Sequence, residues 1–254
     1  MYDIVIVGAG MAGLTAAIYG CRAGKSVLLL ESKIYGGQII DTLKVENWPG
    51  DYKVSGKDLM KKIYEQAVEL GAKIEYGEVS KIEESKSGFV VKTEDGEYVA
   101  KSVILAMGTE PRRLSEKQTK DAGKRPISYC AICDGALYRG KPVVVVGSGN
   151  TAKYEMAYLK NIASKVYHIH HDDPISEDAE AVFVAIGRVP STKFLEGFVE
   201  LDKEGYVVAG EDCRTSRSGI FVAGDCRTKK TRQLVTAAGD GAVAAGQAVQ
   251  YLQK

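Results

Sequence analysis

The feature that most constrains the fold is a buried strand, a glycine-rich turn and a helix in immediate succession, which occurs twice in the chain. In the first copy, residues 3–7 are mostly apolar and β-branched, the turn GAGMAG occupies 8–13, and a helix is predicted over 14–23. A strand that is apolar throughout is buried on both faces, as in a parallel sheet covered by helices. The second copy begins with four valines at 143–146. The repeat predicts an α/β protein with two Rossmann-like dinucleotide-binding domains.

The three glycines of the first turn have separate roles. Gly8 allows the tight turn, Gly10 lets the backbone approach a pyrophosphate, and Gly13 lets the helix pack closely on the strand. Free N–H groups at the helix start then bind the phosphates. Glu31 follows the next strand, eighteen residues past Gly13, close to the ~20-residue spacing at which a carboxylate binds an adenosine ribose. Strand, turn, helix and acid in this order predict a dinucleotide site.

The second turn, GSGNTA, predicts a further nucleotide site at Gly147, Gly149 and Ala152, with Ala152 in place of the third glycine. A helix is predicted over 152–160 and a strand over 165–170, which repeats the order of the first unit. The pattern therefore lies on both sides of the central part of the chain.

The second domain is predicted to be shortened. Gly147 to Gly187 is 41 residues, and one strand–helix–strand unit takes about 30 or more, so there is room for one unit and an added strand at 181–186. The strand before it ends in His170 and His171, followed by aspartates. A 2′-phosphate favours arginine at this position, whereas a carboxylate suits a free 2′-hydroxyl. The sequence therefore disfavours NADPH and allows NADH only if the pocket is retained.

A pair of cysteines with an acid directly after it lies between the two turns. Cys130 and Cys133 are spaced so that their sulfurs can bond, and such a pair cycles between thiols and disulfide. Asp134 is placed to exchange a proton as a thiolate forms. The alternative is half of a zinc site, which commonly needs a second such pair. The sequence has no second Cys-x-x-Cys, although histidines at 168–171 could complete a site. We therefore predict a redox dithiol and no metal.

Composition excludes several classes of partner. The net charge of the 254-residue chain is +1, so neither nucleic acid nor a membrane surface is indicated. The sequence contains no apolar run of about eighteen residues that would span a membrane. Met1 leads almost directly into the first strand, with no basic region and no cleavage site, so a cytoplasmic location is predicted.

The remaining segments are less distinctive. The polar stretch 110–124 is interpreted as the crossing into the second domain. Residues 234–251 are rich in alanine and glycine and predict a closely packed helix, whose start would stabilise an anionic ligand. Lys229, Lys230 and Arg232 are interpreted as solvated surface, with a docking patch for an acidic electron donor as the alternative. Other predicted elements are a helix at 56–70 and strands at 73–76, 78–83, 88–93, 98–100, 103–106, 206–208 and 219–223.

The ordered set of motifs resembles the low-molecular-weight, flavin-dependent thioredoxin reductases, which are pyridine nucleotide-disulfide oxidoreductases. The resemblance covers almost the whole chain except residues 172–180, and its specificity lies in the order, since no single motif would suffice. The matching segments are GAGMAG at 8–13, Glu31, GGQ at 36–38, ENWPG at 46–50, AxGT at 106–109, SYCxxCDG at 128–135, GxGxxA at 147–152, FxAIGxxP at 183–190, and AGD at 223–225 with RQ at 232–233.

The resemblance implies a discontinuous FAD-binding domain made of residues 1–113 and 187–254. A shortened pyridine-nucleotide-type domain, residues 114–186, would be inserted in it and carry the dithiol. The family also implies a homodimer. FAD would be held by Gly8, Gly10, Gly13, Glu31, Gly37, Gln38, Asn47, Gly108, Asp225 and Gln233.

The resemblance also implies a route for electrons. FAD would pass two electrons to the disulfide at Cys133, and Cys130 would attack the disulfide of thioredoxin or a similar small protein, with Asp134 as proton donor. The two arginines that hold the NADPH 2′-phosphate in this family fall near His171 and Asp172 here. Relatives without a working NADPH site take electrons from ferredoxin or a reduced deazaflavin. Two alternatives stay open: a dithiol oxidase that uses oxygen, and a flavin-binding redox sensor without turnover.

Overall fold

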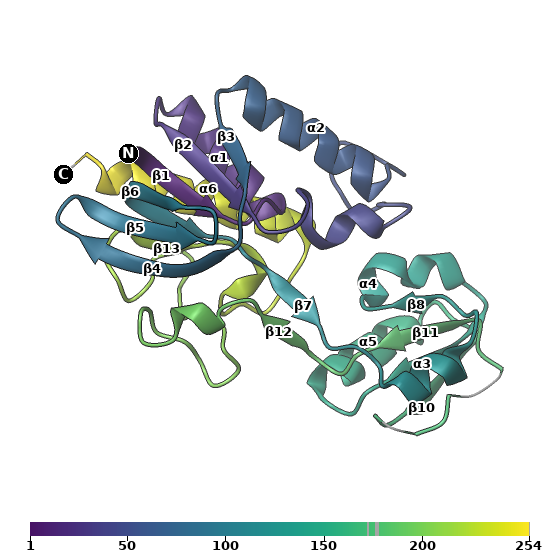
Figure 1. Ribbon diagram of the computed structural model, residues 1–254. Helices are drawn as coiled ribbons and strands as arrows, with labels where there is room; N and C mark the ends of the chain where they lie inside the picture. Colours follow the sequence, from purple (N-terminus) through teal and green to yellow (C-terminus); the bar gives the residue numbers. More distant parts are fainter. Residues whose placement is uncertain (172, 176–177, 254) are drawn as a thin grey trace. The chain divides into compact units, whose positions relative to one another are not determined.

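The chain forms two compact units (Figure 1), of which the computed structural model describes residues 1–171, 173–175 and 178–253. Unit 1 consists of Met1–Thr109 and Pro190–Lys254, and unit 2 of Glu110–Val189. The chain crosses between them at β7 (Thr109–Pro111) and β12 (Arg188–Pro190), which pair with each other. Unit 2 is therefore an insertion in unit 1.

Unit 1 is built on a mixed sheet with the strand order β3-β2-β1-β6-β5-β4, and β13 also pairs with β6. β1, β2, β3, β6 and β13 run parallel to one another, whereas β5 is antiparallel to β4 and β6. The carboxyl ends of the parallel strands therefore share one edge, where α/β sheets bind ligands. The strands are β1 (Tyr2–Val7), β2 (Val27–Glu31), β3 (Lys73–Tyr76), β4 (Val79–Ser85), β5 (Gly88–Thr93), β6 (Glu97–Leu105) and β13 (Ile220–Val222).

In unit 1, one break between strands and one strand were predicted wrongly. The segments 98–100 and 103–106 belong to one strand, β6, whose first half pairs with β5 and whose second half pairs with β13. The polar residue between them misled the prediction, because Ser102 is buried and its hydroxyl donates to the Asp3 carbonyl at 3.1 Å. The segment 206–208 is not a strand; Val207 makes only isolated bridges.

Helices α1 (Met11–Arg22) and α6 (Leu234–Tyr251) lie side by side in unit 1 (Figure 1). Their backbones approach so closely that a Cβ at Gly241 would lie 2.3 Å from the Ala12 carbonyl oxygen. This close approach explains the small residues of α6, and the predicted helix at 234–251 is confirmed. Unit 1 also contains α2 (Gly56–Glu69) and the 3-10 turns η1 (Gly37–Asp41), η3 (Lys193–Leu195) and η4 (Gly224–Cys226).

Unit 2 is a four-stranded parallel sheet in the order β10-β9-β11-β8. It holds one strand–helix–strand unit, β9-α5-β10, and β11 joins on the other side of β9, as the spacing predicted. Its elements are α3 (Glu116–Ala122), β8 (Ile127–Ser128), α4 (Ala131–Asp134), η2 (Gly135–Tyr138), β9 (Pro142–Val146), α5 (Asn150–Leu159), β10 (Lys165–Ile169) and β11 (Ala181–Val184). The fold class predicted from the two glycine turns is confirmed.

The polar stretch 110–124 is more ordered than predicted. It contains α3, whose N-cap Ser115 accepts a hydrogen bond from the Gln118 backbone N–H at 3.2 Å. Ser115 and Gln118 have the S-x-x-Q spacing of a capping box, a helix-start signal that the sequence interpretation did not use.

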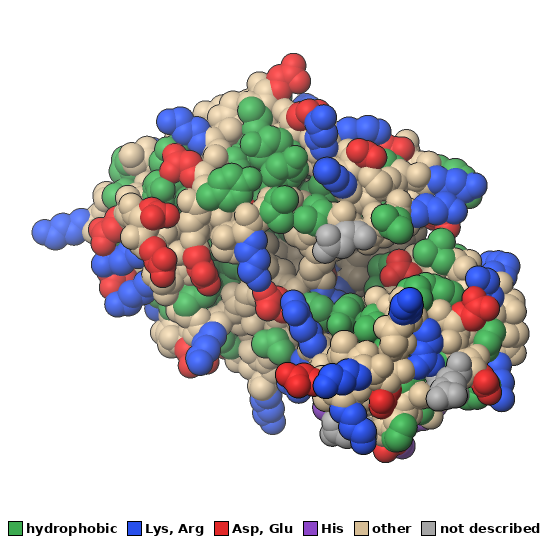
Figure 2. Space-filling view, turned by 45° about the vertical axis from the view of Figure 1, so that its right-hand side comes forward, with side chains coloured by type: hydrophobic (Ala, Val, Ile, Leu, Met, Phe, Trp, Pro, Cys, Tyr) green, Lys and Arg blue, Asp and Glu red, His purple; other side chains and the backbone are tan. Residues whose placement is uncertain are grey.

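The surface drawn in Figure 2 carries basic, acidic and hydrophobic side chains interspersed with one another. This mixture agrees with the nearly balanced charge of the chain. Among the helices of the described residues, none combines the length and apolar character required to cross a bilayer.

Candidate functional site

The first glycine turn of unit 1 is shaped as its sequence predicts. Gly8 has φ +103°, and a Cβ there would lie 2.5 Å from the Ala106 carbonyl oxygen; a Cβ at Gly13 would lie 1.8 Å from the Gly8 oxygen. Both positions therefore require glycine. Gly10, the N-cap of α1, faces open space and has no side-chain cap. The N–H groups at the start of α1 are thus placed to bind an anion.

Glu31 lies at the carboxyl end of β2, beside this turn. Its two carboxylate oxygens accept the Ala9 N–H at 2.7 Å and the Lys33 N–H at 2.9 Å. Each oxygen has a further lone pair for a ribose hydroxyl. The predicted acid is therefore held against the glycine turn by the backbone itself.

A second glycine-rich segment covers the first. The Gly36 N–H donates to the Ala9 carbonyl at 2.8 Å, and a Cβ at Gly37 would lie 3.4 Å from the Gly10 Cα. The side chain of Gln38 donates to the Thr109 carbonyl, and Gly108, at the end of the central strand, has φ +67° and lies beside it. These contacts bring Gly37, Gln38 and Gly108 to the edge of the sheet that carries the first turn.

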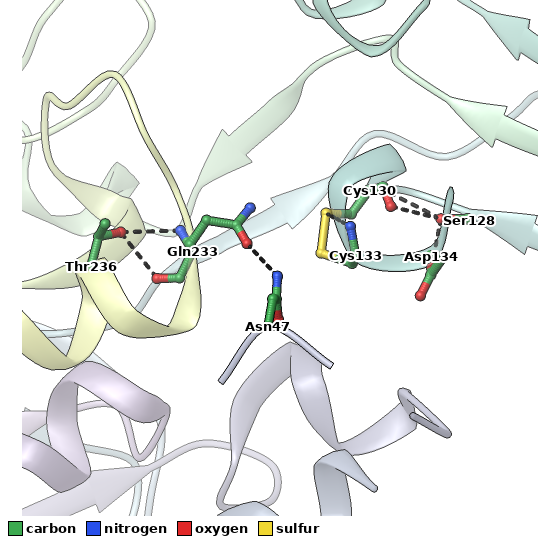
Figure 3. Close-up of a disulfide and its surroundings, with 7 residues drawn as sticks. All are labelled: Asn47, Ser128, Cys130, Cys133, Asp134, Gln233 and Thr236. Atoms are coloured by element: carbon green, nitrogen blue, oxygen red, sulfur yellow. Dashed lines mark hydrogen bonds between the residues drawn. A yellow bond between two sulfur atoms is a disulfide. The ribbon is translucent and has the colours of Figure 1, made fainter. Parts of the chain in front are cut away.

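The start of α6 completes this edge of unit 1. Gln233 and Thr236 form a capping box, and the Asn47 side chain donates to Gln233 Oε1 at 3.1 Å (Figure 3). Asp225 lies in the 3-10 turn that follows β13, and the Arg232 guanidinium donates to its carbonyl at 3.2 Å. Residues predicted from four separate parts of the sequence thus belong to one edge of one sheet.

A buried ion cluster under this edge escaped the sequence interpretation. Asp240 on α6 accepts two hydrogen bonds from the Arg227 guanidinium, at 2.7 and 2.9 Å, and one from Lys229 at 2.7 Å. It also accepts the Gly224 N–H at 3.0 Å. The interpretation of Lys229 as solvated surface was wrong, because its side chain is only 8% exposed; Lys230 is exposed. The sequence feature that could have predicted this cluster is Asp240, a single acidic residue in a helix of mostly small apolar residues.

The residues of this edge fit a dinucleotide cofactor of the FAD type. This fit is supported by the open space at Gly10 and the uncapped N–H groups beside it. Any side chain at position 10 would enter the space that a phosphate needs. The carboxylate of Glu31 supplies the acceptor that a ribose requires. The chemistry of the donors and acceptors is therefore that of a dinucleotide site.

Residues 128–134 of unit 2, here called the redox turn, hold the predicted cysteine pair as a disulfide. The Cys130 and Cys133 sulfurs are bonded at 2.11 Å (Figure 3). Cys130 is the N-cap of α4, and its sulfur accepts the Cys133 N–H at 3.2 Å. Asp134 is held by Ser128, whose hydroxyl donates to the carboxylate at 2.6 Å and accepts the Cys130 N–H at 3.1 Å. The turn therefore places an N–H at one sulfur and a carboxylate nearby.

The second glycine turn, also in unit 2, has the same backbone shape. Gly147 has φ +142°, and a Cβ there would lie 2.3 Å from the Ala185 carbonyl oxygen. Gly149 faces open space and caps α5 without a side chain. Ala152 is fully buried. Unlike Gly13 in the first turn, this third position has room for a methyl group, which explains alanine there.

Histidines lie where the second turn would meet a nucleotide. His170, directly after β10, hydrogen-bonds through Nδ1 to the Ser148 hydroxyl at 2.6 Å, and its backbone N–H donates to the Asp173 carboxylate at 3.2 Å. His168 Nε2 donates to the Gly147 carbonyl at 2.6 Å. His171 is exposed, and Asp172 lies outside the described residues. In the described part of the chain, no group of three or more His, Cys, Asp or Glu side chains is placed to hold a metal.

The other three cysteines are free. Cys213 and Cys226 are buried, and desolvation raises the pKa of each thiol to about 11. Thiols with such a pKa are protonated at neutral pH and react slowly. The reactive sulfur chemistry is therefore expected at the Cys130–Cys133 pair.

Together these features define a class: a dinucleotide-dependent disulfide oxidoreductase, with one complete dinucleotide turn and a disulfide on a unit that holds a second turn. The chain belongs to the family described as Pyridine nucleotide-disulphide oxidoreductase, which matches residues 2–177 and 170–242. It is 36% identical to the thioredoxin reductase of Bacillus subtilis (strain 168), over all of this chain and 96% of the relative.

Solved structures give the same grouping. Thioredoxin reductase from Streptococcus pyogenes MGAS5005 is 34% identical with a TM-score of 0.91, over 100% of this chain and 98% of that one. A ferredoxin-flavin thioredoxin reductase from Clostridium acetobutylicum is 30% identical with a TM-score of 0.64, over 99% and 97%. The predicted family, the low-molecular-weight thioredoxin reductases, and the enzyme class, an FAD-dependent disulfide oxidoreductase, are confirmed.

The comparison with the Bacillus relative also shows alignment positions that this chain lacks. The Bacillus alignment runs over 302 positions and covers all 254 residues of this chain, so 302 minus 254, or 48, positions of the alignment have no residue here. The family matches the chain in two parts that overlap at residues 170–177. This overlap follows β10, in the part of unit 2 that the sequence predicts to be shortened.

Proposed function

We propose that this oxidoreductase reduces the disulfide of thioredoxin or a similar small protein with its Cys130/Cys133 dithiol. The proposal rests on the Cys130–Cys133 disulfide, which lies on a turn that already supplies an N–H to one sulfur and a carboxylate nearby. Thioredoxin is the proposed substrate because relatives over the full chain are thioredoxin reductases. The family also supports a homodimer as the proposed assembly.

The edge of unit 1 is the proposed FAD site. FAD, when bound, supplies the two electrons that convert the disulfide into the dithiol. Gly8, Gly10 and Gly13 would form the pyrophosphate turn, and Glu31 would accept from the ribose. The other proposed contacts are Gly37, Gln38, Asn47, Gly108, Asp225 and Gln233.

In the reduced turn, Cys130 is the proposed nucleophile. The Cys133 N–H that its sulfur accepts in the disulfide form would stabilise a thiolate, as helix N-termini do. The thiolate attacks one sulfur of the substrate disulfide and forms a mixed disulfide, and the other substrate sulfur leaves as a thiolate. Cys133 then attacks Cys130, which releases the reduced substrate. Asp134, oriented by Ser128, would take the proton of the Cys133 thiol as that sulfur attacks and pass it to the leaving sulfur of the substrate.

We further propose that NADPH is not the electron donor. The position after β10 that would hold a 2′-phosphate has His171 and Asp172 in place of the two arginines, and the neighbouring Asp173 carboxylate would repel a phosphate. Gly147, Gly149 and Ala152 keep the shape of a nucleotide turn, which supports NADH. The ferredoxin-flavin relative supports reduced ferredoxin, and a reduced deazaflavin is a third candidate.

Anaerobic titration of the flavin absorbance tests both proposals. We expect NADPH to reduce the flavin at least about 100-fold less efficiently than the best donor, since two lost charged hydrogen bonds cost about 3 kcal/mol or more. NADH, reduced ferredoxin and reduced deazaflavin are compared at equal concentration. The reduced enzyme is then mixed with oxidised thioredoxin and the new thiols are counted.

The same titration separates the alternatives. Efficient reduction by NADPH would contradict the donor proposal. Thiols that appear on thioredoxin in stoichiometric amount exclude a sensor without turnover. If reduced enzyme instead leaves thioredoxin oxidised, while air reoxidises the flavin with net consumption of a small dithiol, the dithiol oxidase replaces the proposed function.

A further inference from the structure

Glu155 is a buried acidic side chain of unit 2 that the chemistry above does not use. It is 8% exposed and lies on α5 between Ala152 and Leu159. These three residues follow the i, i+3, i+7 spacing that puts side chains on one helical face. Glutamate is almost never buried unless it is paired. Its place on the core face of α5 therefore calls for a specific role.

The core face of α5 lies against the redox turn. Ala131, the residue after Cys130, is fully buried and belongs to the same apolar cluster as Ala152 and Leu159. A Cβ at Gly135 would lie 3.0 Å from the Leu159 side chain. The segment 131–135 and α5 are thus packed against each other. Across this contact, the Ala131 backbone N–H faces the Glu155 carboxyl and favours its ionised form.

The second carboxyl oxygen of Glu155, Oε2, is fully enclosed and has no hydrogen-bond partner among the described residues. The charged group that faces Glu155 is Arg188 on β12. Of the titratable groups on the redox turn and η2, Asp134 is bonded to Ser128 and Tyr138 packs on an apolar ring. Burial raises the pKa of Glu155 to about 7, against the opposing effects of the Ala131 N–H and Arg188.

We infer that Glu155 is a positioning residue of the redox turn, which takes up and releases a proton as the Cys130–Cys133 pair changes redox state. The inference rests on the proposed function only in that the disulfide must be reversibly reduced. A carboxyl that faces the N–H of the residue after Cys130 helps to fix the first turn of α4. Because Ala131 directly follows Cys130, a charge on a carboxyl beside the Ala131 N–H would influence ionisation of the Cys130 sulfur, and the reverse.

Two electrons and one proton break the S–S bond and give a Cys130 thiolate and a Cys133 thiol. The new negative charge disfavours a second one at Glu155, so the carboxylate takes up a further proton. When the pair is reoxidised by a protein disulfide, the S–S bond re-forms and Glu155 returns its proton to solvent. Reduction therefore consumes more protons near pH 7 than the sulfurs alone require.

The test is the disulfide equilibrium of the flavin-loaded enzyme in dithiothreitol redox buffers from pH 5.5 to 8.5. Differential alkylation and mass spectrometry of the peptide with Cys130 and Cys133 give the reduced fraction. The wild type is compared with Glu155→Gln, which keeps an oxygen for the Ala131 N–H but cannot titrate. Glu180→Gln, at an exposed acid of the same unit, is the matched control.

We expect the ratio of wild-type to Glu155→Gln equilibrium constants to change around pH 7, by about tenfold for each pKa unit of coupling. Glu180→Gln should follow the wild type. A pH-independent ratio would overturn the inference. If the pair does not respond to the buffers at all, the proposed function fails instead. The two failures are therefore distinguishable without thioredoxin turnover.

A second readout uses stability. Because the pKa of folded Glu155 lies above its ordinary value of 4.5, the folded form binds the extra proton, and stability is lost as pH rises through about 7. Glu155→Gln should lack this loss, so its urea midpoint should rise relative to the wild type between pH 5 and 8. Should the variant fail to fold, the redox-induced infrared difference spectrum of the wild type must show a protonated carboxyl in the reduced state. Its absence would refute the inference.

Discussion

Replacing Cys130 with serine is expected to abolish reduction of a protein disulfide while leaving flavin bound. A serine hydroxyl does not ionise near neutral pH and cannot form a disulfide with Cys133, so both the nucleophile and the electron carrier are lost. Unit 1 provides the proposed FAD contacts and is unaffected by the change. The measurement mixes photoreduced enzyme with oxidised thioredoxin and counts thiols, which makes it independent of the natural donor. The rate should fall to that measured without enzyme.

The matched variant is Cys133→Ser. It keeps the Cys130 thiolate and the backbone N–H at residue 133, which donates to that sulfur, but lacks the sulfur that resolves the mixed disulfide. We therefore expect it to accumulate a covalent adduct with thioredoxin, visible by mass spectrometry, that dithiothreitol releases. An adduct with Cys130→Ser instead would reverse the roles of the two cysteines, and undiminished transfer by Cys130→Ser would refute the proposed function.

The parts of the fold that the sequence predicted are those fixed by local backbone geometry. Gly8 and Gly147 each have a positive φ and a carbonyl oxygen within 2.5 Å of where a Cβ would be. A Cβ at Gly13 would lie 1.8 Å from the Gly8 carbonyl oxygen. Such constraints act within a few residues or on one neighbouring strand, so they leave a spacing in the sequence that can be recognised. The Cys-x-x-Cys disulfide is local in the same sense.

Contacts between side chains of different helices and loops do not produce a recognisable spacing in the sequence. Asp240 bonds to Arg227 and Lys229 across the loop that precedes α6. In a linear sequence the two cations look like solvated surface, because nothing marks which acid they meet. Glu155 is similar: its helix alternates polar and apolar residues in a way that does not distinguish a buried acid from an exposed one. These positions required the packing of α6 and α5 to be known.

Replacing Asp240 with alanine is expected to have the second large effect, on both stability and flavin affinity. Burial raises the pKa of Asp240, but the hydrogen bonds from Arg227 and Lys229 lower it by more than burial raises it. The pKa is therefore below its usual value, and the carboxylate is ionised at neutral pH. Its removal leaves two buried cations without their partner, which costs about 3–5 kcal/mol. It also removes the acceptor of the Gly224 N–H, at the turn that carries Asp225. FAD affinity should fall at least about tenfold, because a freed turn must be ordered again on binding.

Three further variants separate charge from geometry. Asp240→Asn keeps an oxygen for the Gly224 N–H, so it should lose stability in urea but retain more FAD affinity than Asp240→Ala in a fluorescence titration of the apoprotein. Lys229→Met leaves Arg227 and Asp240 as a neutral ion pair. It should therefore lower the free energy of unfolding by less than Asp240→Ala does. Lys230→Met, at the exposed neighbour, should behave as the wild type. Wild-type FAD affinity in a folded but destabilised Asp240→Ala protein would limit the cluster to the core of unit 1 and remove its link to the proposed cofactor site.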